Sequence, residues 1–157
     1  MSARSKAISD PDRKKLSITR VFNAPRELVW QAWASPEHIG LWWGPDGFTT
    51  TIQKMDFREG GEWIFVMHGP DGTYYANRIV FNRIVQPELI TYTHFVIPLF
   101  FVEVGFEKQG EKTRLEMVMR CESQEQYEDA VERIGIIPGL EQTIGRLDDY
   151  VREIANN

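Results

Sequence analysis

Apolar and polar residues alternate along the first regular part of the chain. Between Leu16 and Phe22 every second residue is apolar except Arg20, which interrupts the set. A period of two is typical of a half-buried strand. Pro25 then begins a predicted helix over 25–34, because the first turn of a helix does not need the N–H that proline lacks. A second, short helix is predicted from Pro36.

Six further segments keep the period of a strand and are separated by short turns. They are Phe48–Phe57, Glu62–His68, Thr73–Gln86, Glu88–Phe95, Phe100–Lys108 and Lys112–Cys121. Short turns predict antiparallel neighbours, because parallel strands need long crossover connections. In the last segment Leu115, Met117 and Met119 share one face. This apolar face of the sheet must pack against another element.

The elements that pack against this face are predicted at the C-terminus. Ser123 and Gln126 form a capping box for one helix. After a break at 135–139, apolar residues recur at spacings of four and three, which predicts one side of a helix about 25 Å long. They are Leu140, Ile144, Leu147, Val151 and Ile154. The pattern predicts an α+β fold in which a curved antiparallel sheet of about seven strands grips a long C-terminal helix.

Composition indicates one domain and narrows its partners. We expect residues 15–157 to form the domain, after a flexible polar leader at 1–14. The net charge of −5 argues against binding along a nucleic-acid backbone. No apolar run reaches the ~18 residues of a membrane span, and the start lacks a signal-peptide core, so a soluble cytoplasmic protein is expected. Cys121 is the single cysteine, and no metal site or cofactor is expected.

One block of the sequence resembles a known family. Ser35 is expected to cap the helix from Pro36, the pair Trp42-Trp43 runs into a Gly-Pro-Asp-Gly turn, and a double glycine precedes Trp63. This block is similar to the family of activator of heat-shock-protein-90 ATPase homologues, in the START-like and birch-pollen-allergen-like superfamily. The resemblance extends over about residues 16–155. It implies the helix-grip fold, with a ligand cavity between the sheet and the C-terminal helix.

The expected cavity has aromatic and sulfur-containing side chains to line it. The residues expected to bind a ligand are Trp43, Trp63, Phe65, Met67, His94, Met117, Met119, Ile144 and Gly145. Methionine adapts to irregular apolar shapes. Glycine costs about 1 kcal/mol relative to alanine inside a helix, so Gly145 marks either space for a ligand or a close approach to a strand. The alternative is that these side chains simply fill the core.

Three histidines raise the question of catalysis. His68 ends one predicted strand and His94 lies near the end of another, which could bring them toward one rim, with Tyr92 or Asp71 as a partner, as candidates for acid–base catalysis. The chain has no His-Glu-x-x-His motif, nucleophile elbow or metal-ligand spacing, so a structural or cavity-lining histidine is the alternative. Asp56 and Arg58 form either a polar clamp or an ion pair that pins a turn.

One apolar segment departs from the family pattern. Where the resemblance implies a polar turn, residues 95–102 are apolar around a proline. Such a segment is costly to leave in water, so it folds over the cavity mouth or forms an oligomer contact. The hypothesis is a lid or homodimer contact built on Ile97, Leu99 and Phe101.

Three roles follow from the resemblance. The first is a soluble module that binds a small apolar or aromatic molecule. The second is a cyclase- or aromatase-like enzyme that uses the same cavity, because relatives in the superfamily include such enzymes. The third is a regulator of a heat-shock ATPase, although stimulation by eukaryotic activators depends on an additional N-terminal domain for which the expected leader has no room.

Overall fold

The computed structural model describes residues 6–9, 14–95, 99–134 and 136–156. The strands are β1 (Lys6–Ser9), β2 (Lys15–Phe22), β3 (Thr49–Met55), β4 (Glu62–His68), β5 (Tyr74–Val85), β6 (Leu89–His94), β7 (Phe100–Gln109) and β8 (Lys112–Cys121). The helices are α1 (Arg26–Trp33), α2 (Pro36–Ile39), α3 (Gln124–Glu128) and α4 (Ile136–Ala155), with a π-helical segment (Asp129–Ile134) between α3 and α4.

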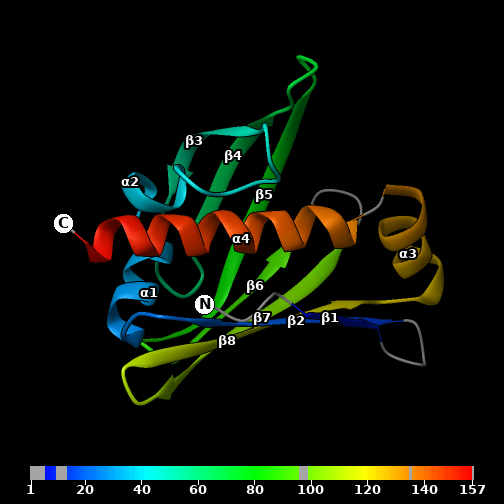
Figure 1. The fold of residues 1–157 in the computed structure, drawn as a ribbon. Coiled ribbons are helices and arrows are strands. Elements are labelled where there is room, and N and C mark those ends of the chain that lie inside the picture. Colours follow the sequence, from blue (N-terminus) through cyan, green and yellow to red (C-terminus); the bar gives the residue numbers. More distant parts are fainter. Residues whose placement is uncertain (1–5, 10–13, 96–98, 135, 157) are drawn as a thin grey trace.

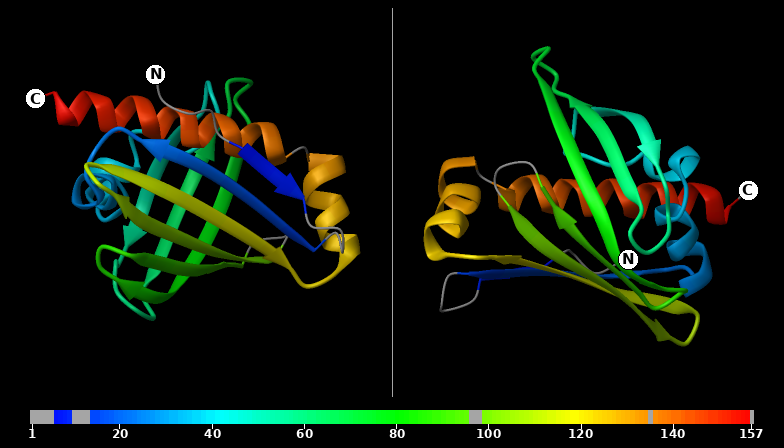
Figure 2. Two further views of the ribbon diagram at one scale, coloured as in Figure 1. Left: turned by 60° about the horizontal axis from the view of Figure 1, so that its bottom comes forward. Right: turned by 180° about the vertical axis from the view of Figure 1, so that it is seen from behind.

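All the strands belong to one curved sheet, in the order β1-β2-β8-β7-β6-β5-β4-β3. Every neighbouring pair is antiparallel, as the short turns require. The long helix α4 lies along the concave side of the sheet, and α1 and α2 lie near its C-terminal end (Figures 1 and 2). The predicted α+β helix-grip fold is confirmed.

The N-terminal edge of the sheet differs from the prediction. Within the described residues the sheet has eight strands, because Lys6–Ser9 pair antiparallel with β2 inside the expected leader. The outer edge of β2 carries backbone N–H and C=O groups that an extended segment satisfies by pairing. The leader was inferred from side-chain polarity, which carries no information about backbone pairing.

The helix ends follow the sequence signals in part. The Ser123 hydroxyl accepts a hydrogen bond from the Gln126 N–H at 3.1 Å, as predicted. Ser35 occupies the N-cap of α2 with Pro36 at the first helical position, as predicted, but its side chain makes no capping bond. The helix α4 begins at Ile136, a turn earlier than expected, because Pro138 falls in its first turn, where a missing N–H costs nothing.

The hydrophobic core lies between the concave face and α4. Leu147 and Val151 of the predicted helix stripe are at most 1% exposed and belong to one core cluster with buried side chains of β2 such as Ile18. Cys121 is buried as well, and burial raises the pKa of its thiol. Among the described residues, no helix combines the length and the apolarity needed to cross a bilayer.

Candidate functional site

The strand register places most of the predicted ligand-binding residues on the concave face. Trp63, Phe65 and Met67 alternate along β4 with residues of the outer face. Across the sheet, Met117 and Met119 of β8 pair with buried residues of β2. At most 5% of the surface is exposed for Trp63, Phe65, Met117, Met119 and Ile144, whereas Met67 is half-buried.

The aromatic members of this set pack against one another. The Trp63 ring stacks on Phe65 with centroids 4.3 Å apart, and Trp43 meets Trp63 edge-on at 4.8 Å. Trp43 also contacts Trp33 of α1 at 5.7 Å. These rings form a continuous aromatic layer, which fits the core-filling alternative for Trp63 and Phe65.

Two hollows lie on the surface, away from the predicted ligand-binding residues. The first, of about 450 Å³, lies at the start of α1 beside the β7–β8 turn. The second, of about 390 Å³, lies between α2 and β3. None of the residues predicted to bind a ligand lines either hollow.

Trp43 is positioned by a side chain that sequence reasoning missed. Nη1 of Arg146, on α4, donates to the carbonyl oxygens of Trp43, Gly44 and Pro45 at 3.4, 2.8 and 3.0 Å. One turn earlier, Gln142 accepts a hydrogen bond from the Asp46 N–H at 3.1 Å. The guanidinium group therefore fastens the 43–46 turn to α4 and orients the Trp43 indole toward the aromatic layer. The sequence gives no signal for this role of Arg146, because its acceptors are backbone carbonyls and every residue has one.

Gly145 lies against a charged side chain of β2. A Cβ atom at Gly145 would be 3.9 Å from Nη1 of Arg20. Nη2 of Arg20 donates to Oδ2 of Asp148 at 3.0 Å. Arg152 donates to the same oxygen at 2.6 Å. The apolar set of β2 is therefore interrupted by an arginine that points inward and bonds to α4. At this distance the Arg20 side chain is in ordinary van der Waals contact, so this contact is not a close approach to a strand that would require glycine.

Replacing Gly145 with alanine is expected to stabilise the protein. A distance of 3.9 Å to Arg20 is an ordinary van der Waals contact, so the added methyl group meets no clash. Alanine also removes the conformational penalty of glycine inside a helix, which is worth about 0.5–1 kcal/mol. Urea denaturation of Gly145→Ala should show a higher midpoint at an unchanged m-value. A loss of stability would contradict this reading of the contact.

The structure does not bring His68 and His94 to one rim. His68 points from the outer face of β4, where its Nε2 is 2.8 Å from the Thr51 hydroxyl. His94 lies on the concave face of β6, is 8% exposed, and follows Tyr92 on the same face. Burial raises the pKa of Tyr92, so its phenol stays neutral at physiological pH. The expected proximity of the two histidines is wrong because their strands present them to opposite faces.

The concave face opens toward solvent at the start of β5. The side chains of β5 that point to the concave face form its inward row. In this row Ile79 is 1% exposed, Asn77 is half-buried and Tyr75 is 46% exposed. His94 lies beside this row, with its Nε2 2.7 Å from Oδ1 of Asn77. The His94 ring also stacks on Phe100 with centroids 4.4 Å apart. Apolar and polar groups thus meet where the core gives way to solvent.

The predicted interface residues have different outcomes. Phe101 is 41% exposed on the outer face of β7, and Leu99 is half-buried. Ile97 lies outside the described residues. Phe95, on the same side, is 49% exposed and lies under the Arg78 guanidinium, whose Cζ is 5.0 Å from the ring centroid.

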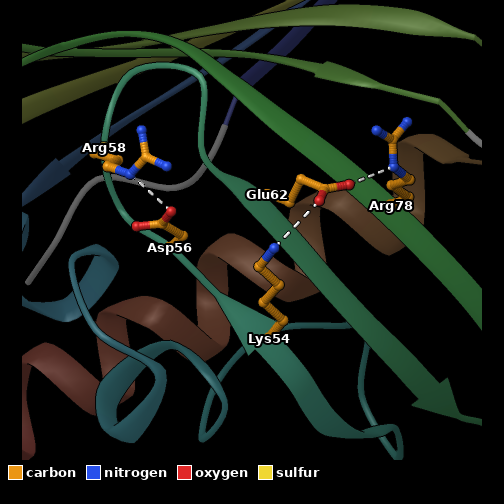
Figure 3. A network of polar contacts seen from close by, with 5 residues as sticks. All are labelled: Lys54, Asp56, Arg58, Glu62 and Arg78. Atoms are coloured by element: carbon orange, nitrogen blue, oxygen red, sulfur yellow. Dashed lines mark hydrogen bonds and ion pairs between the residues drawn. The ribbon is translucent and has the colours of Figure 1, made fainter.

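The Asp56–Arg58 pair stabilises a turn. Nε of Arg58 donates to Oδ2 of Asp56 at 2.7 Å, with both side chains more than one-third exposed (Figure 3). Figure 3 also shows the neighbouring outer-face contacts of Glu62, which accepts from Arg78 at 2.8 Å and from Lys54 at 3.3 Å. Hydrogen bonds from Arg78, and then from Lys54, lower the pKa of Glu62. These contacts fit the ion-pair alternative for Asp56 and Arg58.

Comparison with known proteins agrees with the fold. The family model "Activator of Hsp90 ATPase homolog 1-like protein" matches residues 23–152. A solved protein from Arthrobacter aurescens is 25% identical, with a TM-score of 0.89 over 94% of this chain and 91% of that one. One from Mycobacterium smegmatis is 26% identical, with a TM-score of 0.85 over 98% and 99% of the two chains. An AHSA1-like protein from Aeromonas hydrophila is 21% identical, with a TM-score of 0.74 over 91% and 95%. No curated protein matches the chain.

Proposed function

The chain belongs to the family of Activator of Hsp90 ATPase homolog 1-like proteins, and within this family we propose that it is a cytoplasmic binding module for a small apolar or aromatic molecule. The molecule lies on the concave face between the sheet and α4. The observation that carries this proposal is the exposure of the inward row of β5, which rises from 1% at Ile79 to 46% at Tyr75. An inward-facing row with an open apolar end gives a ligand both a surface and an entrance.

The predicted ligand-binding residues divide into two groups in this proposal. Met67, Trp43 and His94 border the open end and contact the ligand directly. The remaining residues form the floor against which it packs, and Gly145 lies beside Arg20 in that floor. The floor residues are Trp63, Phe65, Met117, Met119 and Ile144.

The two other roles predict different behaviour. A cyclase-like enzyme would use His94 with Tyr92. The raised pKa of Tyr92 suits a hydrogen-bond donor rather than a base. His68 lies on the opposite face of the sheet. A regulator of a heat-shock ATPase is the role that the family name suggests. An assay of the cognate chaperone's ATPase activity, with and without this protein, separates the regulator from the binding module.

Binding is tested with a neutral hydrophobic fluorophore, N-phenyl-1-naphthylamine. Met67→Glu introduces a charge on the concave face, which should weaken binding at least about tenfold because the carboxylate must be desolvated by the ligand. Val66→Glu places the same charge on the outer face of β4 and should leave binding unchanged. No binding by the wild type, or equal binding by both variants, would count against the proposal.

A homodimer contact through Phe101 and Leu99 is the second part of the proposal. The exposed Phe101 ring on the outer face supports it, because a large exposed aromatic side chain is costly in water unless a partner covers it. Native mass spectrometry of the purified protein reports the dimer fraction and any retained ligand mass together. Phe101→Asp should abolish the dimer and leave the ligand mass unchanged, and a wild-type spectrum of monomer alone would overturn the dimer.

A further inference from the structure

A polar pair lies within the apolar concave face. Nε2 of His94 is 2.7 Å from Oδ1 of Asn77, and 8% of the His94 surface is exposed. The two side chains come from neighbouring strands, since His94 is paired with Ile79, two residues along β5 from Asn77. Buried polar groups cost desolvation free energy even when they bond to each other, and an apolar pair could fill the same space.

The orientation of the Asn77 amide follows from its other bond. Nδ2 of Asn77 donates to the backbone carbonyl of Tyr75 at 3.0 Å, and a carbonyl can only accept. Oδ1 must therefore face His94, so that Nε2 of His94 carries the proton and donates. The Tyr75 carbonyl and His94 together hold the carboxamide in one orientation.

The Asn77 carboxamide retains unused hydrogen-bonding capacity. A primary amide offers two N–H donors and can accept two hydrogen bonds. Within the part of the chain that the structure describes, Asn77 uses one donor on Tyr75 and one lone pair on His94. One N–H and one lone pair are left at a half-buried position on the concave face.

Aromatic side chains lie on the strands near this carboxamide. Phe65 is the cross-strand partner of Asn77 on β4. On the opposite side, Phe100 stacks on His94 with an interplanar angle of 8°. Phe65 is buried, so a flat molecule placed here would contact the exposed Tyr75 and the half-buried Phe100 while one of its edges meets the amide.

We propose that Asn77, oriented by His94, binds the polar group of the ligand, and that the ligand is a planar aromatic molecule carrying a hydroxyl or carboxamide group. This inference rests on the proposed binding function and names its ligand class. A hydroxyl group donates to the remaining lone pair of Oδ1, and a carboxamide also accepts from the remaining N–H. Asn77 and His94 therefore select among aromatic ligands by their polar substituent.

The test compares 2-naphthol with naphthalene, which share a ring system and differ by one hydroxyl group. Dissociation constants are measured by NMR titration for the wild type and for the double variant Asn77→Leu/His94→Phe, which removes both polar groups together. The preference for 2-naphthol over naphthalene should fall about tenfold in the double variant, the equivalent of one hydrogen bond. Asn82→Leu is the matched control, because Asn82 is on the same strand but bonds to Thr93 of the outer face.

A second measurement uses the wild type alone, in case the double variant does not fold. 2-Naphthol should shift the side-chain NH₂ resonances of Asn77, and naphthalene should leave them in place. An unchanged preference in the double variant, or equal effects of both probes on Asn77, overturns this site while the binding function stands. Failure of both probes to bind the wild type overturns the site and the binding function together.

Discussion

Asp148→Ala is expected to lower the free energy of unfolding by about 3–5 kcal/mol, the cost of breaking a buried ion pair by removing one partner. The Asp148 side chain is 1% exposed, and its Oδ2 accepts hydrogen bonds from Arg20 and Arg152. Arg20 is only 16% exposed, so without the carboxylate its charge stays mostly out of water and loses the hydrogen bond from its Nη2 to Oδ2 of Asp148. Chemical denaturation of the variant measures this loss.

Two further variants make the Asp148 prediction specific. Asp149→Ala removes the neighbouring, exposed carboxylate of α4 and should change stability by less than about 0.5 kcal/mol. Arg20→Met combined with Asp148→Leu replaces the pair by apolar side chains and should recover most of the loss. If Asp148→Ala cost no more than Asp149→Ala, the buried network would contribute nothing to stability.

Gly61→Ala is expected to cost about 3 kcal/mol or more. A Cβ atom at Gly61 would lie 2.0 Å from the carbonyl oxygen of Asp56, far inside van der Waals contact. The backbone cannot easily move away, because the Gly61 N–H donates to Arg58 and its carbonyl accepts from the Phe81 N–H at 3.0 Å. The clash therefore has to break the turn between β3 and β4.

The adjacent glycine is the matched control for Gly61. Gly60 has φ +81° and nothing within 4 Å of its Cβ position, so Gly60→Ala should cost only the roughly 1–2 kcal/mol of a left-handed residue. Urea denaturation of both variants gives the two losses on one scale. Equal losses would show that the turn absorbs the methyl group without breaking.

Turn chemistry and periodicity made most of the fold predictable from the sequence. The double glycine at Gly60-Gly61 and the short later turns require antiparallel neighbours, and the order from β3 to β8 follows from them, whereas the pairing of β2 with β8 does not. The strand Lys6–Ser9 was not predictable, because it is held by backbone bonds to the edge of β2 that leave no pattern in its side chains.

The candidate site was predictable only as sets of residues within single strands. Alternation shows that Trp63, Phe65 and Met67 share a face, but it does not show which residues of the next strands share it. The β5–β6 register shifts between Phe81 and Arg83, so from this point on the alternation of β5 side chains between the two faces is displaced by one residue. His68 and His94 point to opposite faces because their partners on β5, Tyr74 and Ile79, are an odd number of residues apart.

The sequence by itself determined the elements from β2 onward, the antiparallel order of β3 to β8 and the apolar stripe of α4, because each depends on residues close together in the chain. Only the tertiary structure decided the partners of Arg20, Arg146 and Asn77. Arg20 bonds to Asp148 and Arg146 to the carbonyls of the 43–46 turn, each across more than one hundred residues of chain. Such contacts depend on how the curved sheet brings β2 and the Trp43 turn onto α4, and a polar side chain gives no local sign of the partner it will meet.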